Sequence, residues 1–401
     1  MPLLIFARLL SSIASLAVLY GAGYLLWSWY DGDVYITATD TLERTREDWR
    51  LVLGVALIAF SFLGRFVIVP LLGRPDTAET RLDLQRAAGD ILDTPTGASL
   101  YVEQHGDRSK PTILFTHGWG LDSTIWQYAK RDLSSDFHLV FWDLPGLGKS
   151  KAGADHRFDP TRFSLELDAV MEFIGSRGVV LVGHSVGGMT IQTLVRDAPD
   201  RVRSRVAGIV LLNTTFTNPI DTVFGAIVFK ALRWPLIEPM LFLTSMLQPL
   251  AWLDAWRAYL SGSAHIANRV QFGRKVTRSQ LNAVTLLGTR NPQGVLAQGN
   301  LGMFRWDASE AMKGYDGPVL IIGGRVDLAT KIEASRTIAS DAPRARLIEV
   351  DDVNHNGFLE NALAYNKAII DFVKGLPKRD PSEERHDKIH VIPVAELAVR
   401  K

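Results

Sequence analysis

Two long apolar stretches separated by a polar one make up the first part of the chain. Residues 9–30 are 22 consecutive positions without a charged side chain, and a helix needs about 20 such residues to cross a bilayer. Residues 51–73 form the second stretch, which Arg65 and Pro70 interrupt. The pattern predicts a two-helix membrane hairpin over residues 1–75. A single span is one alternative, and a signal peptide followed by a peripheral helix is the other.

The cations that flank these stretches bear on membrane orientation. Cytoplasmic loops carry an excess of Lys and Arg, and the two sides of the hairpin differ slightly: Arg8, Arg74, Arg81 and Arg86 lie on the side of the main domain, and Arg44, Arg46 and Arg50 on the other. The distribution of these cations favours a cytoplasmic location for the main domain. We therefore expect the protein in the inner or plasma membrane of a bacterium.

From about residue 95 the pattern changes to short β-branched runs that alternate with amphipathic stretches. Several of these runs are apolar without alternation, as in strands buried on both faces of a parallel sheet. The expected strands are 99–104, 112–116, 138–142, 179–183, 207–212, 318–322 and 346–350, and the expected helices are 122–133, 161–176, 187–197, 330–340 and 360–374. The predicted fold class is α/β, with a mostly parallel central sheet flanked by helices.

A segment rich in large apolar residues interrupts this rhythm, and prolines punctuate it. We interpret it as a helical cap inserted between two strands, either with a packed core of its own or with a face that touches lipid. The predicted organisation is a membrane anchor (1–75), a linker (76–94), the first part of the core (95–213), the cap (214–315), the second part of the core (316–375) and a polar C-terminal tail (376–401).

Composition limits the possible partners and the possible nucleophiles and metal ligands. The 401 residues include 44 Lys and Arg against 43 Asp and Glu, so the net charge is +1. This balance argues against nucleic acid as a partner. The chain has no cysteine, which excludes disulfides, thiolate metal sites and a cysteine nucleophile.

The strongest motif is Gly-His-Ser-Val-Gly-Gly at 183–188. It follows the apolar run VVLV and precedes a helical pattern, which is the strand–turn–helix context of a nucleophile elbow. Ser185 is therefore the expected nucleophile. A Gly-rich structural turn is the alternative interpretation.

A serine nucleophile requires a base, and the base requires an acid that orients it. Asp327 follows the strand at 318–322, and His355 follows the strand at 346–350. The carboxyl ends of parallel strands are where such sheets place their sites. We expect Asp327 as the acid and His355 as the base, with Asp351 and Asp352 as less favoured acids.

An oxyanion hole needs two backbone N–H donors. The amide of Val186, the residue after the nucleophile, is the first candidate. The loop after the strand at 112–116 reads His-Gly-Trp-Gly at 117–120, and it should supply the second donor from Trp119.

Together these motifs resemble the α/β-hydrolase fold family. The resemblance covers roughly residues 95–375 and rests on HGWG at 117–120, DLPGLGKS at 143–150, GHSVGG at 183–188, GRVD at 324–327 and NHNGF at 354–358. It implies a Ser–His–Asp triad and a structural rather than catalytic role for Asp143. Haloalkane dehalogenases and epoxide hydrolases of this fold carry Asp as the nucleophile, so Ser185 disfavours those activities.

The resemblance implies a membrane-anchored serine esterase or lipase that acts on an apolar ester, similar to monoacylglycerol lipases and carboxylesterases. No cofactor and no metal is required, and membrane lipid is an expected partner. A carbon–carbon bond hydrolase or an amidase that uses the same triad is an alternative, and a ligand sensor or scaffold with little turnover is another. Substrate chain length, head group and oligomeric state do not follow from the sequence.

Overall fold

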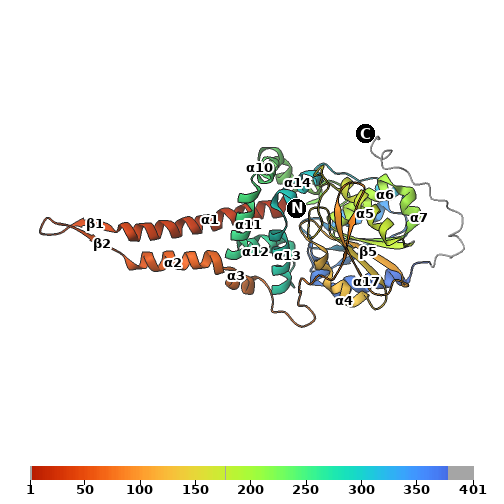
Figure 1. The fold of residues 1–401 in the computed structure, drawn as a ribbon, viewed down its shortest axis with the longest axis horizontal. Helices are drawn as coiled ribbons and strands as arrows, with labels where there is room; N and C mark the ends of the chain where they lie inside the picture. Colours follow the sequence, from red (N-terminus) through yellow and green to blue (C-terminus); the bar gives the residue numbers. More distant parts are fainter. Residues whose placement is uncertain (1, 177, 378–401) are drawn as a thin grey trace.

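An eight-stranded sheet forms the centre of the molecule in the computed structural model, which describes residues 2–176 and 178–377 (Figure 1). The strand order is β10-β9-β8-β7-β5-β6-β4-β3. β5 to β10 pair in parallel, while β4 pairs antiparallel with β6 and β3 antiparallel with β4. The predicted α/β class and mostly parallel sheet are confirmed. Residues 378–401 of the predicted tail lie outside the described residues.

The strands fall close to the expected positions. Their bounds are β3 (Asp90–Asp93), β4 (Ser99–His105), β5 (Thr112–Thr116), β6 (His138–Trp142), β7 (Val179–His184), β8 (Val206–Leu212), β9 (Val319–Gly324) and β10 (Ala345–Val350). Every residue of β5, β6, β7 and β9 is buried, as expected for apolar strands covered on both faces. β3 is an additional edge strand inside the predicted linker 76–94.

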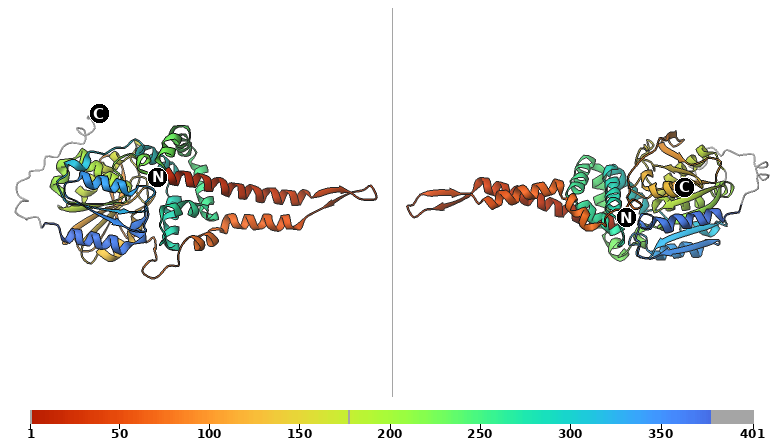
Figure 2. Two further views of the ribbon diagram at one scale, coloured as in Figure 1. Left: turned by 180° about the vertical axis from the view of Figure 1, so that it is seen from behind. Right: turned by 90° about the horizontal axis from the view of Figure 1, so that it is seen from below.

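Helices cover both faces of the sheet (Figures 1 and 2). Phe163 and Leu167 of α5 and Ile191 of α6 belong to the hydrophobic core of one face. Tyr128 of α4 and Tyr365 of α17 belong to the core of the other. The helices of the core are α4 (Gln127–Leu133), α5 (Pro160–Ile174), α6 (Val186–Asp197), α7 (Pro199–Arg205), α15 (Ile332–Asp341), α16 (Gly357–Glu360) and α17 (Ala362–Lys374), with 3₁₀ turns at Ser123–Trp126 and Ala311–Gly314.

The segment between β8 and β9 is helical. It contains α8 (Pro219–Thr222), α9 (Ala226–Leu232), α10 (Glu238–Met246), α11 (Gln248–Ser261), α12 (Ser263–Asn268), α13 (Arg278–Arg290) and α14 (Gln293–Met303), with a π-helical turn at Arg233–Ile237 and a 3₁₀ turn at Arg269–Gln271. A capping box between Thr277 and Gln280 starts α13, which satisfies two amides that the helix itself leaves unpaired. These helices stand between the sheet and the N-terminal hairpin (Figure 1).

The N-terminal hairpin projects away from the rest of the molecule (Figures 1 and 2). It consists of α1 (Pro2–Asp31), the antiparallel strands β1 (Asp33–Ile36) and β2 (Leu42–Thr45), α2 (Asp48–Leu63) and α3 (Arg65–Leu72). α1 is long and apolar enough to cross a membrane, and α2 with α3 qualifies as a second span if the bent pair is taken as one. The second apolar stretch is not one straight helix, because α2 and α3 meet at a 62° bend.

The base of the hairpin is fixed to the cap. Phe6 of α1 packs edge-on against Phe229 of α9, with ring centroids 6.5 Å apart. Further along α1, the Ser12 hydroxyl donates to Asp254 of α11 at 2.5 Å, and the Ser15 hydroxyl lies 3.1 Å from that of Ser261. The first half of α1 therefore shares apolar and polar contacts with the cap.

A buried ion cluster joins the segment after the hairpin to the core. The Asp143 side chain is fully buried and accepts hydrogen bonds from the Ser123 amide at 2.7 Å and the Lys149 amide at 2.8 Å. The Arg86 guanidinium donates to Asp143 at 2.5 Å and to Asp122 at 2.6 Å. Asp143 therefore holds together the turn at 143–150, in agreement with the structural role expected for it.

We predict that Asp143→Ala lowers the free energy of unfolding by about 3–5 kcal/mol, because it leaves the Arg86 charge buried without its main partner. Urea unfolding of the detergent-solubilised protein, followed by tryptophan fluorescence, measures this. Asp136→Ala is the matched control: its ion pair with Lys374 is exposed, so the loss should stay below about 1 kcal/mol. Equal losses in the two variants would contradict the assignment.

Candidate functional site

Ser185 occupies a tight turn between β7 and α6. Its backbone has φ 54° and ψ −117°, a strained combination for a residue with a side chain. A Cβ at Gly183 would lie 2.5 Å from the Gly187 carbonyl carbon, and a Cβ at Gly187 would collide with the Thr116 carbonyl. The motif glycines are therefore required by the closeness of strand and helix, as the elbow interpretation predicted.

The structure brings the three expected triad residues together. His355 Nε2 lies 3.0 Å from Ser185 Oγ, and His355 Nδ1 lies 3.1 Å from Asp327 Oδ2. All three side chains are at least 95% buried. The less favoured acids lie elsewhere: Asp351 pairs with Arg325 at 2.9 Å on the surface, and Asp352 is also exposed.

Asp327 is held by a dense set of donors. The amides of Ala329 and Thr330 donate to Oδ1 at 2.8 and 2.9 Å. The Thr330 hydroxyl and the Asn213 amide donate to Oδ2 at 2.9 and 3.0 Å. Burial alone would raise the pKa of the Asp327 carboxyl, but the charge of His355 and these hydrogen bonds outweigh it and lower that pKa. The acid is therefore ionised and fixed in orientation.

His184, one residue before the nucleophile, supports the loop that carries His355. Its Nε2 bonds the backbone carbonyl of His355 at 2.9 Å. Burial, reinforced by the neighbouring charge of His355, lowers the pKa of His184 to about 3. A ring that stays neutral at physiological pH donates through one nitrogen only, so His184 holds this loop without adding a charge next to the site.

The loop after β5 lies against His184 and Ser185. A Cβ at Gly118 would be 2.6 Å from His184 Nδ1 and 3.4 Å from Ser185 Cβ. The Trp119 indole donates to the Leu296 carbonyl of α14 at 3.0 Å and stacks on Phe163, which fixes the loop backbone. In the described residues, the amides of Trp119 and Val186 donate to no backbone carbonyl, so both are free to receive an oxyanion.

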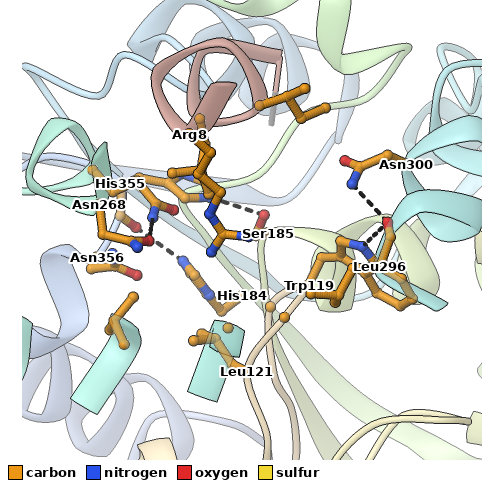
Figure 3. Close-up of a pocket in the computed structure, with 17 residues that line it drawn as sticks. Arg8, Trp119, Leu121, His184, Ser185, Asn268, Leu296, Asn300, His355 and Asn356 are labelled. Carbon is orange, nitrogen blue, oxygen red and sulfur yellow. Dashed lines mark hydrogen bonds between the residues drawn. The ribbon is translucent and has the colours of Figure 1, made fainter. Parts of the chain in front are cut away.

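A small cavity of about 50 Å³ adjoins Ser185 (Figure 3). The nucleophile side contributes Ser185, His184 and His355. The cap contributes Asn268, Gln271, Val284, Gly288, Leu296 and Asn300. The first turns of α1 contribute Leu4, Ile5 and Arg8. Within the described residues, no group of three or more His, Asp and Glu side chains is placed to hold a metal ion.

Sequence reasoning missed several residues of this site. Asn213 has a positive φ of 44° directly after β8, and its place at a strand's carboxyl end was the available signal. Thr330 and Asn354 stand near the predicted acid and base, and Asn354 accepts from the amides of Leu328 and His355. Arg8 gave no local signal, because only the tertiary fold brings the first turns of α1 to the pocket.

Comparisons with known proteins agree with the fold and its motifs. The family model described as "alpha/beta hydrolase fold" matches residues 111–362, more than half of the chain. A relative from Nitrosomonas europaea, a pimeloyl-[acyl-carrier protein] methyl ester esterase, is 28% identical over 272 residues, which is 65% of this chain and 94% of the relative.

A bifunctional esterase/perhydrolase from Acinetobacter calcoaceticus is 25% identical over 283 residues, covering 70% of this chain and 98% of the relative. Among solved structures, an esterase from Exiguobacterium antarcticum superposes with a TM-score of 0.58 at 18% identity, over 72% of this chain and all of that one. At that identity the superposition speaks for the fold alone. On the match over residues 111–362, the chain belongs to the α/β-hydrolase fold family.

Proposed function

We propose that this hydrolase is a membrane-anchored serine esterase that cleaves carboxylic esters with an apolar acyl group. The observation that carries the proposal is the hydrogen-bonded series Ser185–His355–Asp327 at a nucleophile elbow. The esterase names of the relatives support the reaction class.

In the proposed mechanism, His355 Nε2 takes the proton of Ser185 as Oγ attacks the ester carbonyl. Asp327 keeps the imidazole in the required tautomer and stabilises the imidazolium, and the amides of Trp119 and Val186 receive the oxyanion. His355 then protonates the leaving alcohol. Water, deprotonated by His355, attacks the acyl-enzyme and releases the acid.

Exposed apolar side chains support the membrane part of the proposal. Trp27 and Tyr30 near the far end of α1 are more than half exposed, as in an aromatic belt at a membrane surface. The cap exposes a set of large apolar residues beside the hairpin base: Phe224, Ile227, Val228, Trp234, Phe242, Leu243, Met246, Leu250, Trp252 and Leu253. We propose that this cap face rests on the bilayer into which the hairpin inserts, and that the core lies on the cytoplasmic side.

The cavity beside Ser185 is small for this function. Its volume of about 50 Å³ compares with about 300–1,000 Å³ for typical ligand sites. Leu4, Ile5 and Arg8 form one wall of the cavity. An acyl chain therefore requires these side chains, or the turn of α1 that carries them, to shift as the substrate enters.

We predict that a fluorophosphonate probe labels the wild-type protein and that Ser185→Ala abolishes both labelling and hydrolysis of p-nitrophenyl esters. The reason is that the Ser185 hydroxyl lies 3.0 Å from His355 Nε2, the nitrogen that would take its proton. Ser340→Ala, at an exposed hydroxyl on α15, is the control and should label like the wild type. A folded wild-type protein that neither labels nor hydrolyses any ester would favour the sensor or scaffold alternative.

We expect Asp327→Asn to lower kcat by about 10⁴-fold, the size of effect seen when an amide replaces a triad carboxylate and stabilises the wrong tautomer. Steady-state kinetics on the same esters measure it. Asp351→Asn alters an exposed ion pair and should change kcat less than about two-fold. A larger loss for Asp351→Asn than for Asp327→Asn would refute the assignment of the acid.

The absence of native cysteine makes membrane topology directly testable. Thr39→Cys places a thiol at the hairpin tip, and Glu310→Cys places one on the core; both positions are exposed. In intact cells we expect a membrane-impermeant maleimide to label the first and not the second. Equal accessibility of the two thiols would mean that the hairpin lies on the membrane instead of crossing it.

A further inference from the structure

Arg8 is a cation that the proposed mechanism does not use. It extends from α1 into the pocket that Ser185, His184 and His355 also line (Figure 3). Among the described residues that line this cavity, Arg8 alone carries a permanent charge, and none is acidic. Its guanidinium forms no ion pair or hydrogen bond with any described residue.

The surroundings leave room for the guanidinium and offer it no protein partner. A Cβ at Gly288 of α13 would lie 2.5 Å from Arg8 Nη2, so the absence of a side chain there makes space for the Arg8 head group. Asn356, which is 2% exposed and lines the same cavity, has a side-chain N–H group with no hydrogen-bond partner. Partly buried charges and buried donors ordinarily have partners.

Arg8 also lies at a particular depth along α1. Trp27 lies 19 positions further along α1, which corresponds to about 29 Å of helix. The hydrocarbon core of a bilayer is about 30 Å thick. If Trp27 marks the far membrane surface, Arg8 and the pocket lie at the level of the near head groups.

We propose that Arg8, assisted by the Asn356 side-chain amide, binds an anionic oxygen group of the substrate and makes the enzyme selective for esters that carry a carboxylate or a phosphate. This inference rests on the proposed esterase function and assigns its substrate class. A guanidinium presents paired N–H donors that match the two oxygens of such a group. The anion balances the charge of the Arg8 guanidinium, while the rest of the substrate contacts apolar wall residues such as Leu4, Ile5 and Leu121.

The test uses the full-length protein in zwitterionic phosphatidylcholine nanodiscs and two substrate pairs. One pair is the mono-p-nitrophenyl ester of a medium-chain diacid against the p-nitrophenyl ester of the matching monoacid. The other is an acylglycerol phosphate against the acylglycerol. The first pair tests a carboxylate on the acyl side and the second a phosphate on the alcohol side.

We expect the wild type to prefer the anionic member of at least one pair. Arg8→Gln should lower kcat/KM for that member about ten-fold or more relative to kcat/KM for the neutral member, as expected for the loss of a charge-assisted hydrogen bond. Gly288→Ala, which displaces the guanidinium without removing it, should act in the same direction. Arg44→Gln, at the exposed hairpin tip, should preserve the preference.

An unchanged preference in Arg8→Gln, or equal losses on both members of each pair, would overturn the inference and leave the esterase function intact. If no ester is hydrolysed, a binding measurement still distinguishes failure of anion recognition by Arg8 from failure of the proposed esterase function. In Ser185→Ala, calorimetry compares monomethyl sebacate, which carries a free carboxylate besides its ester, with methyl decanoate. Adding Arg8→Gln should weaken binding of the anionic ester about ten-fold more than binding of the neutral one. Equal changes for the two esters would refute anion recognition independently of catalysis.

Discussion

The close approach of β7 and α6 at Ser185 is the constraint on which the site depends. The turn between them leaves no space for side chains at Gly183 and Gly187 and forces Ser185 into a strained backbone conformation. Such strain costs on the order of 1–3 kcal/mol and persists only where the surroundings fix it. Here the Ser185 amide donates to Leu212 at 3.1 Å, and the Thr214 hydroxyl donates to the Ser185 carbonyl at 2.6 Å.

The two hydrophobic cores of the sheet sustain that turn from opposite sides. Val186 and Met189 of α6 pack into one core, while Val182 of β7 packs into the other. The strands on either side of β7 then bring their own loops to the same edge: β5 carries Trp119, and β8 carries Asn213. Sheet order therefore explains why Trp119 and Asn213, which are 94 positions apart in the chain, both lie near Ser185.

The residues that could be predicted from the sequence share a local signature. Ser185, Asp327 and His355 each follow an apolar strand and stand in short motifs, so their shared place at the carboxyl ends of parallel strands suggested that they would meet. β3 escaped prediction because four residues with a charge at each end carry too little hydrophobic pattern to indicate a strand. The bend between α2 and α3 was not predicted, because a single glycine hardly changes a hydropathy pattern. In the structure Gly64 lies at the bend, where a Cβ would collide with the Ser261 carbonyl oxygen.

The position of Arg8 could not be predicted from the sequence pattern, since Arg8 of α1 and Gly288 of α13 are 280 positions apart in the chain. Their contact has a consequence for biosynthesis. α1 is synthesised long before Val284 and Gly288. The pocket beside Ser185 is therefore completed only when the late cap helices pack against α1. A chain without α1 would lack the wall that Leu4, Ile5 and Arg8 form.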